Sequence, residues 1–389
     1  MARLDNDGDV LLAGPAVRAV AAAADRVVLL AGPRGAAAAR LLPGVDEVLV
    51  WHCPWIDSHP RPVERGDVEG LVATLAGLAL AEAVVLTSFH QSPLPLALLL
   101  RMAGVPRVSA ESVDYPGSLL DVRHRMPEAG LHEVERMLST VAAAGFPLPP
   151  GDDGRLAVRR PLPEPGALLG PGPAPDAYVV LHPGASVPAR AWSPERCAAA
   201  VEALSDAGHR VLVTGGPGER ALTARVAGTR GVDLGGATDL AGLAGLLARA
   251  DCLVVGNTGP AHLAAAVGTP VVSLFAPVVP AERWQPYGVP VVLLGDQAAP
   301  CRDSRARTCP VPGHPCLDDL DPEVVVTAVR TLSADRGEGA PPPATAVAGS
   351  APAPGAPARP SAPARRGPVP RGGPDRRSST ALDTAEVQA

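Results

Sequence analysis

The segment Gly256–His262 places small, amide, hydroxyl and imidazole side chains directly after an apolar run, Cys252–Val255. Pro260 is preorganised for the first turn of a helix, and Thr258 has the side chain of an N-cap residue. Free backbone N–H groups at a helix N-terminus bind anions such as phosphate. The segment is therefore either a phosphate-binding loop or a plain strand–turn–helix connection. In the first case, the contact residues are Asn257, Thr258, Gly259, Pro260 and His262.

A second polar loop follows the apolar run Tyr178–Leu181. It contains Ser186 and Arg190, and Ser193 and Pro194 after it are typical of the N-cap and first position of a helix. A guanidinium group can neutralise a diphosphate through a forked contact. Arg190 is thus a candidate phosphate ligand, with a solvated loop charge as the alternative.

A third loop follows the run Arg210–Thr214 and contributes Thr214, Gly215 and Gly216. A glycine-rich strand end also serves tight turning alone, so this loop by itself is a weak signal. The carboxyl ends of parallel strands share one edge of a sheet, where such folds bind ligands. Three loops of this kind in one half of the chain therefore predict a cleft for a nucleotide diphosphate.

Asp9 is the candidate catalytic residue in the first half. It follows a glycine turn at Asp5–Gly8, and we expect a helix from Val10 to Ala22 behind it. A carboxylate at this place is either a simple helix cap or, if it faces an interdomain cleft, a general base for an acceptor hydroxyl. Because a helix N-terminus stabilises negative charge, we expect no upward shift of its pKa.

Two histidines of the first half, His52 and His90, follow apolar runs and are weak candidates for acceptor contacts. The neighbouring Trp51 and Trp55 share that position along the chain. Packing of the loops themselves explains each of these side chains equally well. The sequence does not choose between the two interpretations.

Three cysteines, Cys301, Cys309 and Cys316, lie with His314 in a loop rich in Pro and Arg. Three thiols and an imidazole are a conceivable zinc set, but the loop lacks the closely spaced Cys pair of structural zinc sites. Ordinary loop packing is the better interpretation, and no metal site is predicted.

Short apolar runs alternate with helix-like stretches along most of the chain. This pattern is typical of parallel sheets covered by helices on both faces. A stretch crowded with Pro and Gly interrupts the pattern at residues 161–175. We therefore expect a Rossmann-like domain at 1–160, a linker at 161–175, a second such domain at 176–333 and a disordered tail at 334–389. Only Met1–Leu4 are available for the first strand, which is short for a strand. We therefore expect the true start codon to lie further upstream.

Composition excludes several functions. All 34 basic residues are arginines, so no Schiff-base lysine chemistry is available, and the formal net charge is −6. A negative chain is a poor nucleic-acid partner. No run reaches the roughly 18 apolar residues of a membrane span, and no secretion signal is evident, so a cytoplasmic location is expected. Arginines scattered through the tail could touch the inner membrane surface, although a solvated tail explains them as well.

The motifs RLDxxGDV, HPGAS followed by ARAW, TGGPGE, and GNTGPAHLAAAVGTPVVSLFAP together resemble glycosyltransferase family 9, the heptosyltransferases. The resemblance covers roughly Ala2 to Ser333. It implies the GT-B fold, in which two Rossmann-like domains face each other across a cleft. In this fold the domain at 1–160 would bind the acceptor and the domain at 176–333 the nucleotide-sugar donor. It also implies inverting, metal-independent transfer without a cofactor, typically from ADP-heptose to a saccharide or glycoconjugate acceptor.

By position, the resemblance makes Asp9 the catalytic base and places Thr258, Gly259 and His262 in the nucleotide-diphosphate loop. Arg190 stands where a lysine is common, and Asn257 where an aspartate is common. The helix near Pro322–Leu332 resembles a segment that packs back across the cleft. Two alternatives remain: a nucleotide-sugar epimerase of the same fold, which would change the donor sugar without an acceptor, and a nucleotide-sugar binding protein without turnover.

Overall fold

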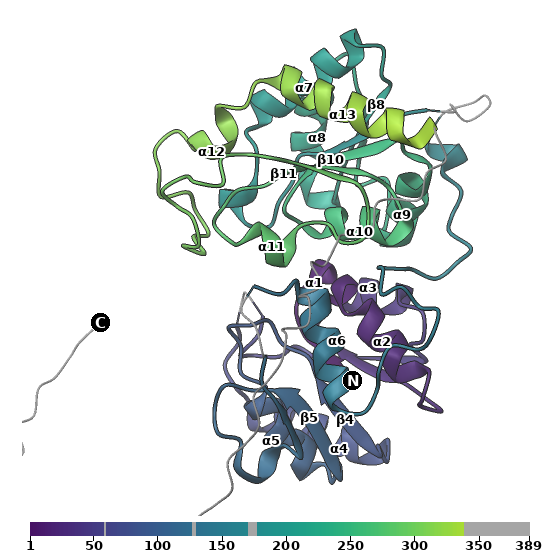
Figure 1. The fold of residues 1–389 in the computed structure, drawn as a ribbon, viewed down its shortest axis with the longest axis vertical. Helices are drawn as coiled ribbons and strands as arrows, with labels where there is room; N and C mark the ends of the chain where they lie inside the picture. The colour runs from purple at the N-terminus through teal and green to yellow at the C-terminus, as the bar shows by residue number, and fades with distance from the viewer. Residues whose placement is uncertain (58–59, 127–129, 170–176, 338–389) are drawn as a thin grey trace, which may run out of the picture. The chain divides into compact units, whose positions relative to one another are not determined.

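The computed structural model describes residues 1–57, 60–126, 130–169 and 177–337, and these belong to one compact unit. They form two parallel sheets, each of six strands with helices on both faces (Figure 1). The predicted tail lies outside the described residues, apart from the end of the last helix. Within the part that is described, every helix is too short or too polar to cross a bilayer.

The first sheet has the strand order β3-β2-β1-β4-β5-β6. Its strands are β1 (Ala2–Arg3), β2 (Val28–Ala31), β3 (Glu47–Val50), β4 (Glu82–Val85), β5 (Arg107–Glu111) and β6 (Val122–His124). Its helices are α1 (Asp7–Leu12), α2 (Gly14–Ala21), α3 (Ala36–Leu41), α4 (Arg65–Gly77), α5 (Leu94–Met102) and α6 (Glu133–Ala143).

The second sheet has the order β12-β11-β10-β7-β8-β9. Its strands are β7 (Val179–His182), β8 (Val211–Gly215), β9 (Val232–Gly235), β10 (Cys252–Gly256), β11 (Val271–Leu274) and β12 (Val291–Leu294). Its helices are α7 (Pro194–Asp206), α8 (Arg220–Ala227), α9 (Leu240–Arg249), α10 (Gly259–Val267), α11 (Ala281–Trp284), α12 (Pro315–Asp318) and α13 (Pro322–Gly337).

Both sheets reverse their strand order at one place, between β1 and β4 in the first and between β7 and β10 in the second. At such a switch point neighbouring strands send their loops in opposite directions and leave a crevice for ligands. The loops that follow β7 and β10 carry the predicted phosphate contacts. The loops that follow β1 and β4 carry Asp9 and His90.

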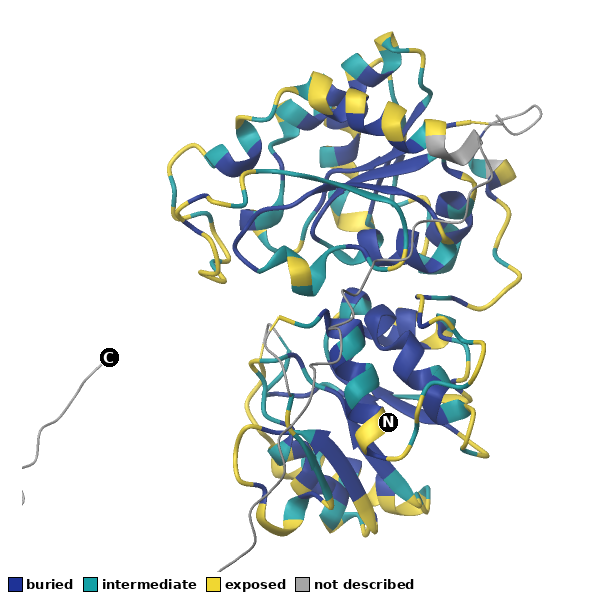
Figure 2. Ribbon diagram, in the orientation of Figure 1, coloured by how far each residue is buried: buried dark blue, intermediate teal, exposed yellow. Residues whose placement is uncertain are grey.

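The central strands of both sheets are buried (Figure 2), and alternate residues of the second sheet belong to two different cores. Val180, Leu212 and Leu253 share a core with α9 and α10, whereas Leu181, Val213 and Val254 pack with α7 and α13. Burial on both faces explains why these strands read as continuous apolar runs. The helix expected to return across the cleft, α13, contacts α7 and the strands β10, β11 and β12 of the second sheet.

The first strand is only two residues long, yet it occupies the middle of its sheet. Ala2 and Arg3 pair with Leu30 and Ala31 of β2, and Ala2 also pairs with Val85 of β4. The N-terminal ammonium group adds a 2.8 Å hydrogen bond to the Val28 carbonyl. This short strand sets the starting point of the loop that leads to Asp9.

The helix expected from Val10 to Ala22 differs in the structure. It begins at Asp7, so Asp9 lies inside the first turn, and it is divided at Ala13 into α1 and α2. Pro15 is the cause, because its missing N–H cannot continue the hydrogen-bond ladder of α1. Asp9 is thereby carried by a separate helix of six residues.

Candidate active site at the strand ends

The loop after β10 enters α10 with Thr258 as N-cap in an extended conformation. Its side chain makes no capping hydrogen bond, so the predicted position is correct but the predicted cap bond is not formed. Gly259 and Pro260 form the first positions of the helix and are half-buried. A Cβ atom on Gly256 would come within 2.7 Å of the Arg190 carbonyl oxygen, so glycine is what lets the two loops touch.

Several buried polar atoms around this helix end have no partner among the described residues. They are Asn257 Nδ2, His262 Nδ1 and Arg190 Nε. Asn257 and His262 are only 5% and 4% exposed. Buried donors and acceptors are almost always paired, so a bound ligand or an ordered water is expected to complete these atoms. Their position at a helix N-terminus suits a phosphate-bearing ligand.

His262 is held in its neutral form. Burial lowers the pKa of its imidazole to about 3, and the nearby His132 and Arg190 act in the same direction. A neutral ring has one N–H donor and one acceptor nitrogen at any ordinary pH. His262 therefore offers a hydrogen bond to a ligand and supplies no positive charge.

Arg190 is the cation at this place. It ends the 3₁₀ turn Pro188–Arg190, and the Ala189 N–H donates to the Arg307 carbonyl at 3.0 Å, which fixes the turn from behind. Burial lowers the pKa of Arg190, while the carboxylate of Asp9 acts against that shift. Ser186 lies in the same loop and is exposed. The loop therefore presents one charged group toward both α10 and Asp9.

Thr214 and Gly215 end β8 and Gly216 follows it, and their role as donor contacts remains a prediction. Thr214 is 1% exposed, and its Oγ1 lies 3.1 Å from His182 Nδ1, so it supports the base of the site. The Gly216 N–H donates to Glu219 Oε2 at 2.7 Å, and a Cβ on Gly215 would meet Thr223 and Glu219. These three residues shape the loop, and Glu219 is the side chain that extends from it toward Gly184.

Asp9 Oδ1 accepts a 3.1 Å hydrogen bond from Arg3, and the Asp9 side chain is 19% exposed. Burial raises the pKa of Asp9, Glu133 raises it further, and Arg3 and Arg190 oppose the shift. The expectation of an unshifted pKa is therefore wrong, because desolvation and a second carboxylate outweigh the helix N-terminus. A more basic carboxylate is a better proton acceptor, provided that it stays ionised.

A buried polar network supports Asp9. Arg3 is fully buried and contacts Asp5 at 3.2 Å, Asp9 at 3.1 Å and Ser88 Oγ at 3.1 Å. Glu133 is also fully buried and pairs with Arg136 at 2.9 Å. Buried charges require such partners, so these contacts fix the orientation of the Asp9 carboxylate.

The contact between the helices α1 and α10 brings Asp9 to the loop after β10. They make one of the larger helix–helix contacts of the protein. A Cβ on Gly8 would lie 3.1 Å from His262 Cδ2 and 3.2 Å from Gly259 Cα. Only a glycine permits this approach without displacement. Gly8 and His262 are about 250 positions apart in the chain and thus belong to one candidate site.

The weak acceptor candidates have different surroundings. His52 Nε2 lies 3.5 Å from Asp57 Oδ2 and is paired within its own loop. His90 is exposed and lies beside Phe89, and burial and the charge of Arg305 lower its pKa. His90 therefore faces the loops of the second sheet, whereas His52 has a partner in its own loop.

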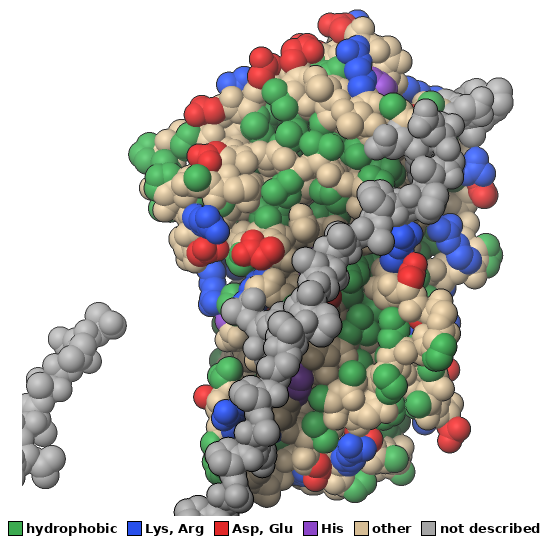
Figure 3. Space-filling model, viewed as in Figure 1, with side chains coloured by type: hydrophobic (Ala, Val, Ile, Leu, Met, Phe, Trp, Pro, Cys, Tyr) green, Lys and Arg blue, Asp and Glu red, His purple; other side chains and the backbone are tan. Residues whose placement is uncertain are grey.

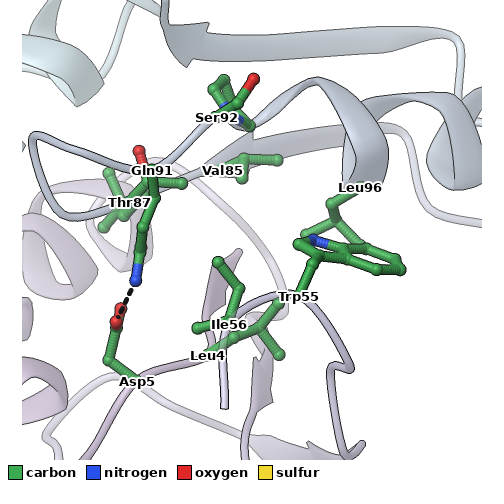
Figure 4. Close-up of a pocket in the computed structure, with 11 residues that line it drawn as sticks. Leu4, Asp5, Trp55, Ile56, Val85, Thr87, Gln91, Ser92 and Leu96 are labelled. Atoms are coloured by element: carbon green, nitrogen blue, oxygen red, sulfur yellow. Dashed lines mark hydrogen bonds between the residues drawn. The ribbon is translucent and has the colours of Figure 1, made fainter. Parts of the chain in front are cut away.

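A small cavity of about 10 Å³ lies at the carboxyl ends of β1 and β4, which is room for about one water molecule (Figure 4). Trp55 and Leu96 close one side, and Gln91 donates a 2.6 Å hydrogen bond to Asp5 on the other. Trp51 donates to Asp67 at 3.1 Å and packs edge-to-face on Trp55. The tryptophans are thus part of the wall of the first domain.

The cysteine loop contains free thiols. Cys301 and Cys316 are buried, Cys309 is half-buried, and burial raises the pKa of Cys316 to about 12. Within the described residues, no three potential ligands are arranged as a metal site. The thiols pack in the core between the second sheet and α13.

Several site residues were not identified from the sequence, namely Arg3, Glu133, Ser88, Phe89 and Glu219. Arg3 and Glu219 stand inside recognisable motifs, so their presence beside charged or glycine-rich positions was a usable signal. The other three come from the loop after β4 and from α6, and only the fold brings them there.

The profile of glycosyltransferase family 9 (heptosyltransferase) matches residues 90–314. Lipopolysaccharide heptosyltransferase 3 of Escherichia coli (strain K12) is 30% identical over 177 residues, which cover 42% of this chain and 49% of that protein. The chain spans about half the length of the curated relatives it matches.

Among solved structures, the glycosyl transferase family 9 protein from Veillonella parvula DSM 2008 has a TM-score of 0.68 at 17% identity, covering 86% of this chain and 96% of that one. The E. coli ADP-heptose lps heptosyltransferase II has a TM-score of 0.67 at 20% identity, covering 86% and 98%. These similarities confirm the predicted α/β GT-B fold.

Proposed function

The chain belongs to glycosyltransferase family 9, and on that premise we propose that it is an inverting, metal-independent enzyme that transfers a heptose-type sugar from ADP-heptose to a saccharide or glycoconjugate acceptor. The observation that carries the proposal is the group of unpartnered buried polar atoms on Asn257, His262 and Arg190. They gather at the N-terminus of α10, beside the one carboxylate that α1 brings there.

The donor binds through the loops of the second sheet. Backbone N–H groups of α10 and the Arg190 guanidinium contact the diphosphate, and the Asn257 amide contacts a hydroxyl of the sugar. The name of the E. coli relative with the GT-B fold includes ADP-heptose, which supports this donor class. An amide differs from a carboxylate because it can donate a hydrogen bond as well as accept one.

Transfer proceeds in one displacement. The acceptor oxygen attacks the anomeric carbon, its proton passes to an Asp9 carboxylate oxygen, and the bond between that carbon and the diphosphate oxygen breaks. The diphosphate leaves with the electron pair, and Arg190 and the α10 amides stabilise its growing charge. Attack from the face opposite the leaving group inverts the configuration.

We place the reaction in lipopolysaccharide assembly in the cytoplasm, because the curated relatives are named lipopolysaccharide heptosyltransferases. The face drawn in Figure 3 carries acidic and arginine side chains interspersed. Nucleic-acid binding requires a concentrated basic surface, and this face shows a mixture of charges instead. The arginines proposed to touch the inner membrane surface lie outside the described residues.

The pH dependence of the rate tests the assignment of Asp9. Only the ionised carboxylate accepts a proton, and its pKa is raised, so we expect the acid limb of kcat/KM to lie above the ordinary aspartate range near 4. Replacing Glu133 with Gln removes a negative neighbour and should move that limb to lower pH. Glu135→Gln, in the same turn of α6, is the control and should leave the limb in place. If the acid limb of kcat/KM did not move in the Glu133→Gln variant, Asp9 would not be the general base.

A panel of nucleotide sugars tests the proposed donor by thermal shift, since a ligand that binds the native state raises the melting temperature. We expect ADP-heptose and ADP to raise it more than UDP- or GDP-sugars do. Incubation of the donor without acceptor should leave its sugar unchanged, whereas an epimerase would alter it. Donor binding without turnover on a range of acceptors would favour a binding protein instead.

A further inference from the structure

Phe89 lies at the carboxyl end of β4 with two arginines on its ring. The Arg283 guanidinium carbon is 4.6 Å from the ring centroid, and that of Arg305 is 4.4 Å from it. Both distances are within the range of a cation–π contact. Arg283 belongs to α11, and Arg305 belongs to the loop between Cys301 and Cys309, so both reach Phe89 from the second sheet's side of the chain.

The loop that carries Arg305 is fixed in an unusual conformation. Arg305 has a φ of 56° and Asp303 a φ of 58°, a region that favours glycine. The N–H groups of Asp303 and Arg305 donate to the carbonyls of Pro277 and Val278, at 2.9 and 2.8 Å. These bonds hold a strained backbone in place, and such strain gathers at functional sites.

The hydrogen-bonding edges of both guanidinium groups remain available. In the part of the chain that the structure describes, neither Arg283 nor Arg305 forms an ion pair or a side-chain hydrogen bond. Stacking uses the face of the guanidinium plane and leaves its forked N–H edge free. Two like charges therefore lie near one ring without a carboxylate to balance them.

This pair of arginines lies close to the proposed base. Ser88, the residue before Phe89, accepts a 3.1 Å hydrogen bond from Arg3, which also donates to Asp9. His90, the residue after it, has its pKa lowered by burial and then by the charge of Arg305. The arginines thus contact the residue between Ser88 and His90, in the loop that follows β4 of the first sheet.

We propose that Arg283 and Arg305, with Phe89 as the platform between them, form a subsite for an anionic group of the acceptor, a carboxylate or a phosphate. The proposal rests on the proposed function, because it assumes that the acceptor binds beside Asp9. It adds a charge requirement to the acceptor and assigns its recognition to side chains that come from the second half of the chain.

Two other roles for these arginines give different results. If they only hold the two halves of the chain together through Phe89, neutral and charged sugars bind equally well. If they contact the donor diphosphate, their removal lowers the affinity for ADP and leaves sugar binding unchanged. The test therefore measures ADP and acceptor-type probes separately.

The experiment uses saturation-transfer NMR on the full chain with glucose, glucuronate and glucose 6-phosphate, each with and without saturating ADP. We expect both charged sugars to bind at least about tenfold more tightly than glucose, since bonds between charged partners contribute most. Preference for glucuronate or for the phosphate ester identifies which anion the subsite takes. Raising the salt concentration should weaken the charged probes, because Arg305 is exposed.

The variants Arg283→Ala and Arg305→Ala should each weaken the charged probes about tenfold and leave glucose and ADP unchanged. Arg302→Ala is the matched control, because Arg302 lies in the same loop and faces Asp303. Phe89→Leu should give a smaller loss, since it removes the platform but keeps both charges. The proposed subsite would be contradicted if the wild-type chain bound all three sugars with equal affinity. It would also be contradicted if the variants lost affinity for ADP alone. Failure of ADP to bind the wild-type chain would instead count against the proposed function.

Discussion

Replacing Asp9 with Asn is expected to lower kcat by about 10²–10⁴-fold, the usual contribution of a general base. The amide keeps the size of the side chain and can still accept the hydrogen bond from Arg3. It cannot take a proton from the acceptor hydroxyl. Affinity for ADP should change little, because the donor contacts lie on the loops of the second sheet. Steady-state kinetics and ADP titration together measure the two effects.

Asp7→Asn is the matched control for this variant. Asp7 lies in the same turn of α1, but its Oδ1 accepts a 3.0 Å hydrogen bond from the Ala38 N–H and has no place in the proposed chemistry. We expect a small loss of stability and a nearly normal kcat. If both variants lost activity equally, the helix α1 would matter only as structure. Wild-type transfer by Asp9→Asn would refute the base assignment.

Replacing Arg190 with Ala should produce the second large effect, a loss of about 10²–10³-fold in kcat/KM for the donor. The guanidinium is the charged group that faces both Asp9 and His262, and its Nε is buried without a partner. Without it, the leaving diphosphate develops its charge against backbone amides alone. Initial rates at varied donor concentration measure the loss.

Arg190→Lys keeps the charge but loses the forked edge, so we expect a loss of donor affinity that is smaller than that of Arg190→Ala. Arg225→Ala serves as a control, since Arg225 is an exposed residue of the same sheet's helices and pairs with Glu195. Its removal should leave the kinetics unchanged. An Arg190→Ala variant with normal donor kinetics would show that the diphosphate binds elsewhere.

The sequence could identify the loops of the site because their signals are local. A proline at the start of a helix, a glycine at a close approach and a buried apolar run each act over a few residues, and Gly256–His262 contains all three. The alternation of apolar runs with helix-like stretches predicted parallel sheets, and the two six-stranded parallel sheets confirm that prediction.

The electrostatics of Asp9 could not be predicted in the same way. Its pKa depends on burial and on Glu133, which lies more than a hundred residues away in α6. The hydrogen bond of Thr214 could likewise not be predicted from the sequence, because its partner His182 comes from the neighbouring strand β7. Local patterns indicate which loops meet, whereas the charges and partners within them depend on the tertiary fold.

A crystal structure of the chain with ADP tests the central claim most directly. We expect the pyrophosphate at the N-terminus of α10, with the Arg190 guanidinium on its oxygens and the adenosine along the loops that follow β7 and β8. His262 Nδ1, which has no partner among the described residues, should gain one from the bound ADP. Electron density for ADP at any other place, with those loops empty, would contradict the account.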